Sequence, residues 1–122
     1  MTTEQIEQGL GEIQALIERQ ATIDSPVDVM EKLNDCVNVL GLSAELIAWT
    51  EKKYNEKLSL LCLDKNYKNL SATDKKMVFA GVLSNEIMLH TRAERLNKAL
   101  VHCLDSLRSI LSYTKEEMKN IR

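Results

Sequence analysis

The chain has 122 residues, a formal net charge of −2 and an apolar fraction of 44%, which excludes a disordered chain and fits one globular domain. Aromatic residues make up only 4% and there is one proline, so the residues that build β-strands and their turns are scarce. This composition predicts an all-α fold in a single helical domain over residues 1–122.

The first helix is predicted over about residues 3–21. Thr2 with Gln5 three residues later makes a capping box. One narrow face carries apolar residues at steps of three and four, namely Ile6, Leu10, Ile13 and Ile17. Gly9 and Gly11 each weaken a helix by up to ~1 kcal/mol relative to alanine, so we expect the start of this helix to fray.

A second helix is predicted as one continuous element over about residues 26–63. It begins with a serine N-cap, Ser25, and a proline at the first helical position, Pro26. Its heptad positions are apolar from Met30 to Leu61, with Glu51 as the one polar interruption. A second apolar stripe lies beside the first and consists of Val39, Leu42, Leu46 and Trp49. A helix with two such stripes is buried on more than one side.

A third helix is predicted over about residues 72–119, after a polar connection over residues 64–69. Ser71 with Asp74, or Thr73 alone, is suited to cap it. Its heptad positions are apolar except for Glu86, and they comprise Phe79, Val82, Leu89, Ala93, Leu96, Leu100, Cys103, Leu107 and Ile110. An unbroken helix of that length spans on the order of 70 Å. It must therefore either break, near Gly81 or Thr114, or project into a partner chain.

The compact arrangement of these elements is a three-helix antiparallel bundle with a coiled-coil hairpin formed by its two long helices. The two long helices carry more apolar surface than one chain can cover, and surplus apolar surface marks an interface. We therefore expect the chain to assemble with itself as a homo-oligomer, a dimer or higher.

Charge is divided unequally along the chain. Residues 1–50 hold nine acidic and two basic residues, for a net charge of −7, whereas residues 51–122 hold nine acidic and fourteen basic residues, for a net charge of +5. Either the acidic half packs near the basic half, or the second half carries an anion-binding face.

The three cysteines form no CxxC motif and lie in apolar contexts, which is typical of buried, reduced thiols in an intracellular protein; they are Cys36, Cys62 and Cys103. No apolar run approaches the roughly 18 residues that span a membrane. We expect a cytoplasmic protein that makes no membrane contact.

Metal and acid–base catalysis find little support in the sequence. Glu86, His90 and Glu94 share a helix face, but di-metal bundles use a Glu-x-x-His step of three and carboxylates from several helices. The paired acidic motifs of an all-α nucleotide pyrophosphohydrolase are matched only by Glu4 with Glu7. No nucleophile elbow, phosphate-binding glycine loop or HExxH motif occurs. The sequence predicts a non-enzymatic protein without a metal site or cofactor.

Anion binding is the better-supported chemistry. The candidate ligand-binding residues flank the heptad positions of the third helix and are Arg92, Arg95, Asn97, Arg108 and Tyr113. Residues that flank such positions face a partner helix or the mouth of a groove, where arginine binds phosphate or carboxylate through two parallel hydrogen bonds. The alternative is that these arginines form inter-helix salt bridges with acidic residues such as Glu31, Asp35 or Glu45.

Nucleic-acid binding is a further alternative, at the tip of the predicted hairpin. Seven lysines surround Tyr67 there, namely Lys52, Lys53, Lys57, Lys65, Lys68, Lys75 and Lys76. Tyrosine stacks on unpaired bases and lysines bind phosphates. Acidic residues are interspersed with these lysines, so a solvated loop is the competing interpretation.

Several stretches carry a resemblance to a known group of proteins. They are the run AERLNKAL at 93–100, the run LDSLRSILSY at 104–113, KEEM at 115–118, EKL at 31–33 and LSAEL at 42–46. Over roughly residues 26–119 the chain resembles small all-helical phage and prophage early-region proteins, which are often encoded near recombination genes.

The resemblance implies no enzymatic activity, a bacterial host cell as the location, and two kinds of role. One is counter-defence by stoichiometric sequestration of a nucleotide signal or of a host protein. The other is an accessory role in phage recombination or single-strand annealing, through binding to DNA or to a recombinase. An oligomer with arginines beside inter-helix grooves suits the first role better, since sequestration needs pockets and no catalytic machinery.

Overall fold

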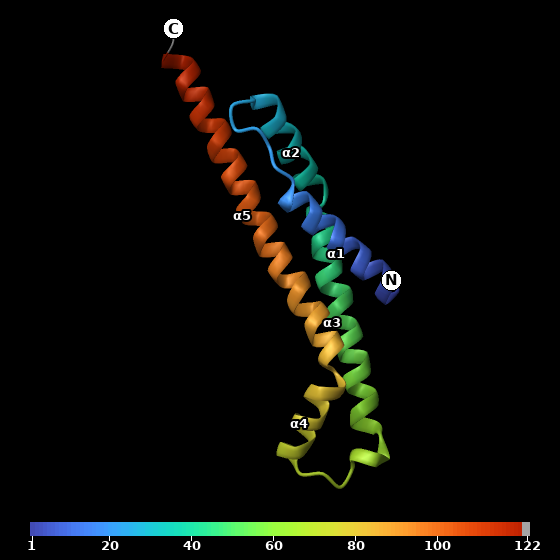
Figure 1. The fold of residues 1–122 in the computed structure, drawn as a ribbon. Helices are drawn as coiled ribbons and strands as arrows, with labels where there is room; N and C mark the ends of the chain where they lie inside the picture. Colours follow the sequence, from blue (N-terminus) through green and yellow to red (C-terminus); the bar gives the residue numbers. More distant parts are fainter. Residues whose placement is uncertain (121–122) are drawn as a thin grey trace.

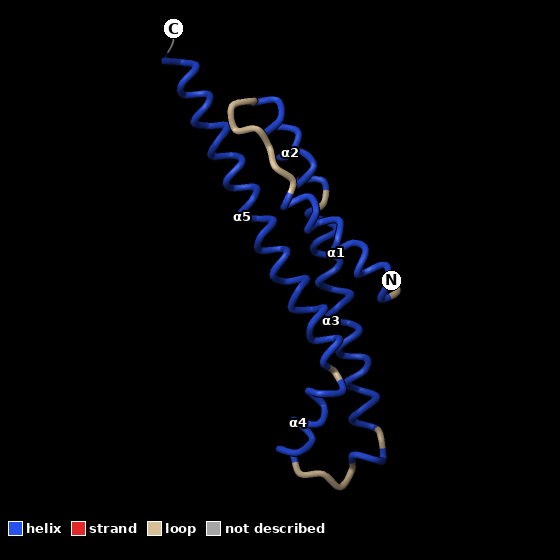
Figure 2. Tube along the Cα trace, viewed as in Figure 1, coloured by secondary structure: helices blue, strands red, loops and turns tan. Residues whose placement is uncertain are grey.

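A computed structural model describes residues 1–120, and in this range the chain is helical with short connections and no strand (Figures 1 and 2). The helices are α1 (Thr3–Glu18), α2 (Pro26–Asn38), α3 (Leu40–Leu63), the short 3-10 helix η1 (Lys65–Tyr67), α4 (Ala72–Val82) and α5 (Ser84–Asn120). The all-α prediction is confirmed. None of the described helices is long and apolar enough to cross a membrane.

Helix α1 begins as predicted, and Gly9 contributes to its packing. The capping box is present, with the Thr2 hydroxyl accepting from the Gln5 backbone N–H at 3.1 Å and Gln5 Oε1 accepting from the Thr2 N–H at 2.8 Å. Gly9 is buried against α3, where an added Cβ would lie 3.1 Å from Leu46 Cδ1. The glycine therefore permits close approach of α1 and α3, and the fraying expected at the start of α1 stays a prediction.

The prediction of one continuous helix over residues 26–63 is wrong, because the helix is interrupted at Val39. This residue ends α2 and precedes α3 with φ −99° and ψ 1°, and its N–H bonds back to the Cys36 carbonyl at 3.3 Å. Val39 is β-branched and Gly41 follows closely, so helix propensity is low at this point. The break turns α2 so that it lies beside the C-terminal half of α5, while α3 pairs with the N-terminal half of α5 (Figure 1).

The break also changes which residues of α2 are buried. The heptad reading placed Met30 and Val37 inside, but both are more than two-fifths exposed, and Val29 and Cys36 are buried instead. Burial and, to a smaller extent, the neighbouring Cys103 thiol raise the pKa of the Cys36 thiol to about 11. Cys36 fits the expected buried thiol, whereas Cys62 is exposed, which contradicts the prediction.

The predicted third helix is broken at Leu83, two residues after Gly81, and it continues without interruption past Thr114 to Asn120. Leu83 is itself only 1% exposed, so the residue at the break is held in the protein interior. The Ser71 hydroxyl caps α4 by accepting from the Asp74 N–H at 3.1 Å, as predicted.

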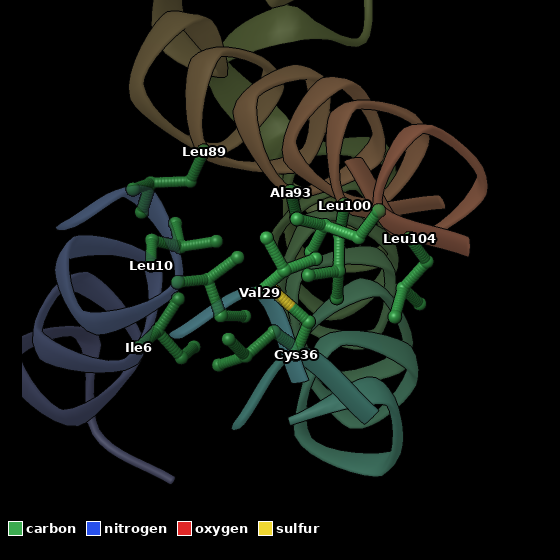
Figure 3. Packing of buried hydrophobic residues seen from close by; sticks show 11 residues of the cluster. Ile6, Leu10, Val29, Cys36, Leu89, Ala93, Leu100 and Leu104 are labelled. Carbon is green, nitrogen blue, oxygen red and sulfur yellow. The ribbon is translucent and has the colours of Figure 1, made fainter. Parts of the chain in front are cut away.

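Helices α3 and α5 run antiparallel, and α1 and α2 pack against them (Figure 1). The buried cluster draws Ile6 and Leu10 from α1, Val29 and Cys36 from α2, and a run of residues from α5, and Figure 3 shows these side chains meeting. The α5 members are Leu89, Ala93, Leu100, Leu104 and Leu107. Most of them are heptad positions predicted from the sequence, so the buried face of α5 was predicted correctly.

Three polar contacts interrupt the apolar interface of α3 and α5 at intervals of seven residues along α3. Asn97 Nδ2 donates to Ser43 Oγ at 3.0 Å, Thr50 Oγ1 lies 3.0 Å from His90 Nδ1, and Lys57 Nζ donates to Glu86 Oε1 at 2.9 Å. Ser43 and Thr50 are both only 2% exposed. Because buried polar groups need partners, these three polar pairs tie the two helices together in one alignment.

Candidate functional site

A groove of about 660 Å³ lies between the C-terminal half of α1 and the N-terminal half of α5. It is lined by Gln14, Ile17, Glu18, Met88, Thr91, Arg92, Arg95, Leu96 and Ala99. The α5 members recur at helical spacings, so they lie along one side of that helix. Two of the predicted ligand-binding residues, Arg92 and Arg95, are therefore brought together in one wall of a groove.

The two arginines of the groove are held differently. Arg92 Nη2 donates to Gln14 Oε1 at 2.9 Å, and Gln14 Nε2 in turn donates to Glu18 Oε1 at 3.1 Å. Arg92 is half-buried and positioned by this contact, whereas Arg95 is exposed and makes no ion pair among residues 1–120. The groove thus offers one oriented guanidinium and one whose donors are open to solvent.

The other three predicted residues lie elsewhere. Asn97 donates a hydrogen bond to Ser43 on the side of α5 that faces α3. Arg108 is exposed and lies 3.7 Å from Asp105 on its own helix. Tyr113 is 67% exposed in a separate hollow, and hydrogen bonding to Glu117 raises its pKa above the ordinary value. Residues 95 and 113 are about 27 Å apart along a helix, a separation that an axial projection does not show.

Contrary to the salt-bridge alternative, no ion pair among residues 1–120 joins the acidic first half to the arginines of α5. Asp35 pairs instead with Arg19, which lies in the same acidic half, at 2.8 Å. Lys32, which is only 8% exposed, donates from Nζ to the Ile17 carbonyl at 3.1 Å and so satisfies a backbone group at the end of α1.

A smaller cavity of about 400 Å³ lies where α3 and the start of α5 approach the N-terminus of α1, and it contains the Lys57–Glu86 pair. Lys57 Nζ also donates to the Val82 carbonyl at 3.1 Å, at the end of α4. The second oxygen of Glu86, Oε2, is buried without a hydrogen-bond partner among the described residues. Burial alone would raise the pKa of Glu86, but its hydrogen bonds with Lys57 and with its own backbone N–H, together with the Lys57 charge, lower it.

Replacing Lys57 with methionine should lower the free energy of unfolding at pH 7 by on the order of 1–2 kcal/mol, because a largely buried carboxylate loses its partner. The native pKa of Glu86 is lowered, so its stabilising effect is present above the ordinary pKa of 4.5 and is lost as pH falls through the native pKa. The difference between wild type and variant should therefore shrink as the pH falls below 4.5. Urea denaturation at pH 7 and in acid measures this.

The control for that experiment is Lys53→Met, since Lys53 lines the same cavity and makes no ion pair within residues 1–120. It should leave stability at pH 7 nearly unchanged. Equal losses in both variants, or a Lys57→Met loss that does not depend on pH, would contradict the assigned role of the pair.

The three residues considered for metal binding, Glu86, His90 and Glu94, each contact another side chain of the protein. His90 lies between Thr50 and Glu94, whose Oε1 is 2.8 Å from His90 Nε2, and Glu86 is paired with Lys57. Among residues 1–120, no three histidine, cysteine or acidic side chains gather in a way that could hold a metal ion.

Aromatic side chains at and near the lysine-rich tip also contact other side chains of the protein. The Tyr67 ring packs edge-to-face on Phe79 with centroids 5.5 Å apart, and Lys52 lies 4.8 Å from the centroid of the Trp49 ring. A tyrosine already packed on a neighbour is a poorer platform for a base, so the geometry favours the groove over the tip as the anion site.

Comparisons with protein-family models, with curated protein sequences and with solved structures each gave no match. The groove and its residues are therefore interpreted from the geometry of this chain.

Proposed function

We propose that this protein is a non-enzymatic binding protein that takes an anionic ligand of nucleotide size in the groove between α1 and α5. The observation that carries the proposal is the placement of Arg92 and Arg95 in one wall beside apolar side chains. Those apolar side chains are Ile17, Met88, Leu96 and Ala99. A nucleotide combines the two chemistries that such a groove accepts, a charged phosphate and a flat base with apolar faces.

The dimensions and preorganisation of the groove support this ligand class. Its volume of about 660 Å³ lies within the range of roughly 300–1,000 Å³ that small-molecule sites occupy. Arg92 is already oriented by Gln14, so less side-chain entropy is lost when it binds phosphate. The planar guanidinium donates two parallel hydrogen bonds to phosphate, which gives geometric selectivity as well as attraction.

Binding without turnover suits sequestration, in which the protein removes a ligand from solution in proportion to its own amount. Given the resemblance of the sequence to phage early-region proteins, the role that we infer is counter-defence within a bacterial host cell, by withdrawal of a nucleotide signal or, where the groove holds an acidic segment, of a host protein. Sharing the protein's surplus apolar surface in a homo-oligomer would multiply the number of grooves per particle.

The test is isothermal titration calorimetry against linear and cyclic nucleotides, with inorganic phosphate as the minimal anion. Arg95→Ala should weaken binding at least about tenfold, which corresponds to about 1.4 kcal/mol, while helical content stays unchanged. Arg108→Ala is the matched control, because Arg108 is an exposed arginine of the same helix outside the groove. Wild type that binds no member of the panel, or an equal loss in both variants, would overturn the proposal.

A further inference from the structure

The hairpin end of the molecule, residues 60–82, exposes large apolar side chains. They are Leu60, Leu63, Met77, Val78 and Val82, of which Leu63 is 81% exposed and Met77 71%. Helix α4 contributes no buried residue at all. The apolar side chains of this end are therefore directed outward rather than used in the protein's own core.

The hairpin end is also basic. It carries Lys65, Lys68, Lys75 and Lys76 against Asp64 and Asp74, for a net charge of +2. None of these four lysines makes an ion pair within the described chain. A cationic, apolar surface of this kind is complementary to one that is anionic and apolar.

The opposite end of the same chain supplies such a surface. This α2 end, residues 23–37, exposes Ile23 at 65%, Val27 at 74% and Met30 at 45%. A hollow of about 360 Å³ with almost wholly apolar walls lies on α2, lined by Pro26, Val27, Met30, Glu31 and Asn34. Four acidic residues and one lysine give this end a net charge of −3, and neither Asp24 nor Glu31 has an ion-pair partner among residues 1–120.

We propose that the α2 end of one copy of this chain binds the hairpin end of a second copy, with apolar side chains of the hairpin end seated on the α2 hollow and lysines beside Asp24 and Glu31. The two ends lie at opposite extremes of an elongated molecule, so one chain cannot bring its own two surfaces together (Figure 1). Soluble monomers rarely leave two such patches uncovered. A contact between unlike surfaces is heterologous, so it extends into an open series or closes as a ring.

The test uses two variants that each disable one end. Val27→Lys with Met30→Lys puts charges into the exposed apolar surface of the α2 end and reduces its net charge from −3 to −1, and Leu63→Asp with Met77→Asp does the same at the hairpin end, from +2 to 0. All four positions are exposed, so helical content by circular dichroism should not change. Val101→Asp is the matched control, because Val101 is 42% exposed on α5 outside both ends. Assembly is measured by analytical ultracentrifugation over a range of protein concentrations.

Wild type should form species larger than the 13.9 kDa monomer, fewer of them at about 500 mM salt than at about 50 mM, because salt screens the charges. Each double variant alone should associate at least about tenfold more weakly. An equimolar mixture of the two should recover association but stop at a heterodimer, since one intact surface remains on each partner. The Val101→Asp chain should behave as wild type.

A wild-type chain that stays monomeric at every concentration would overturn the proposal. So would a mixture of the two variants that fails to associate, or double variants that assemble as wild type does. A monomeric wild type that binds vesicles of anionic phospholipid, with binding abolished by Leu63→Asp and Met77→Asp, would instead assign the hairpin end to a membrane surface.

Discussion

Gly9→Leu should destabilise the protein by up to about 2 kcal/mol, because the new side chain would enter a contact between α1 and α3 that has no room for it. A Cβ at this position already lies 3.1 and 3.2 Å from the two terminal methyl carbons of Leu46, which is fully buried. Overpacking a filled core typically costs about 1–3 kcal/mol, and the helix-propensity gain of up to ~1 kcal/mol offsets only part of it.

The control for Gly9→Leu is Gly11→Leu, two residues further along the same helix. No atom lies within 4 Å of a Cβ built on Gly11, so only the propensity gain should appear, up to ~1 kcal/mol of added stability. Chemical denaturation of both variants measures the difference, expected at about 1–3 kcal/mol because the propensity gain is common to both and only the overpacking cost differs. Equal effects at the two positions would show that α1 does not pack closely on α3.

Leu100→Ala should lower the free energy of unfolding by about 2–5 kcal/mol, through lost burial and the cavity left behind. Leu100 is 0% exposed in the middle of α5 and belongs to the cluster that joins α5 to the other helices. The adjacent Val101→Ala is the control; it is exposed, and alanine is the better helix former, so stability should be unchanged or slightly higher. A decrease of less than about 1 kcal/mol in the free energy of unfolding of Leu100→Ala would contradict the assignment of Leu100 to the core.

The sequence predicted α5 well and α2 poorly, for reasons of packing. In α5 the heptad leucines face both α1 and α3, so one apolar stripe identifies the buried side. In the helix predicted over residues 26–63 the second apolar stripe begins only at Val39, so periodicity alone does not say which face of the preceding residues is buried. The break at Val39 decides it, because it rotates α2 and buries Val29 in place of Met30.

The candidate groove could be predicted only in part. Arg92 and Arg95 were accessible to sequence reasoning because both flank the apolar stripe of one helix. The opposite wall, which includes Gln14 and Glu18, depends on where α1 crosses α5, and a helical projection contains no such information. The Lys57–Glu86 pair did have a signal, since Glu86 is a polar residue at an apolar heptad position and requires a partner on the facing helix.

The three polar pairs of the hairpin bear on how the chain avoids misalignment during folding. Sliding α5 along α3 by one heptad keeps most leucines opposite apolar residues, so hydrophobic burial discriminates weakly between such shifted states. The shift would place Lys57 near His90 and Ser43 near Leu104, and Glu86 would lose its lysine. Shifted hairpins would each contain a desolvated polar group without a partner. The three polar pairs therefore specify the register of α5 against α3, because one alignment of this repetitive interface satisfies all of them.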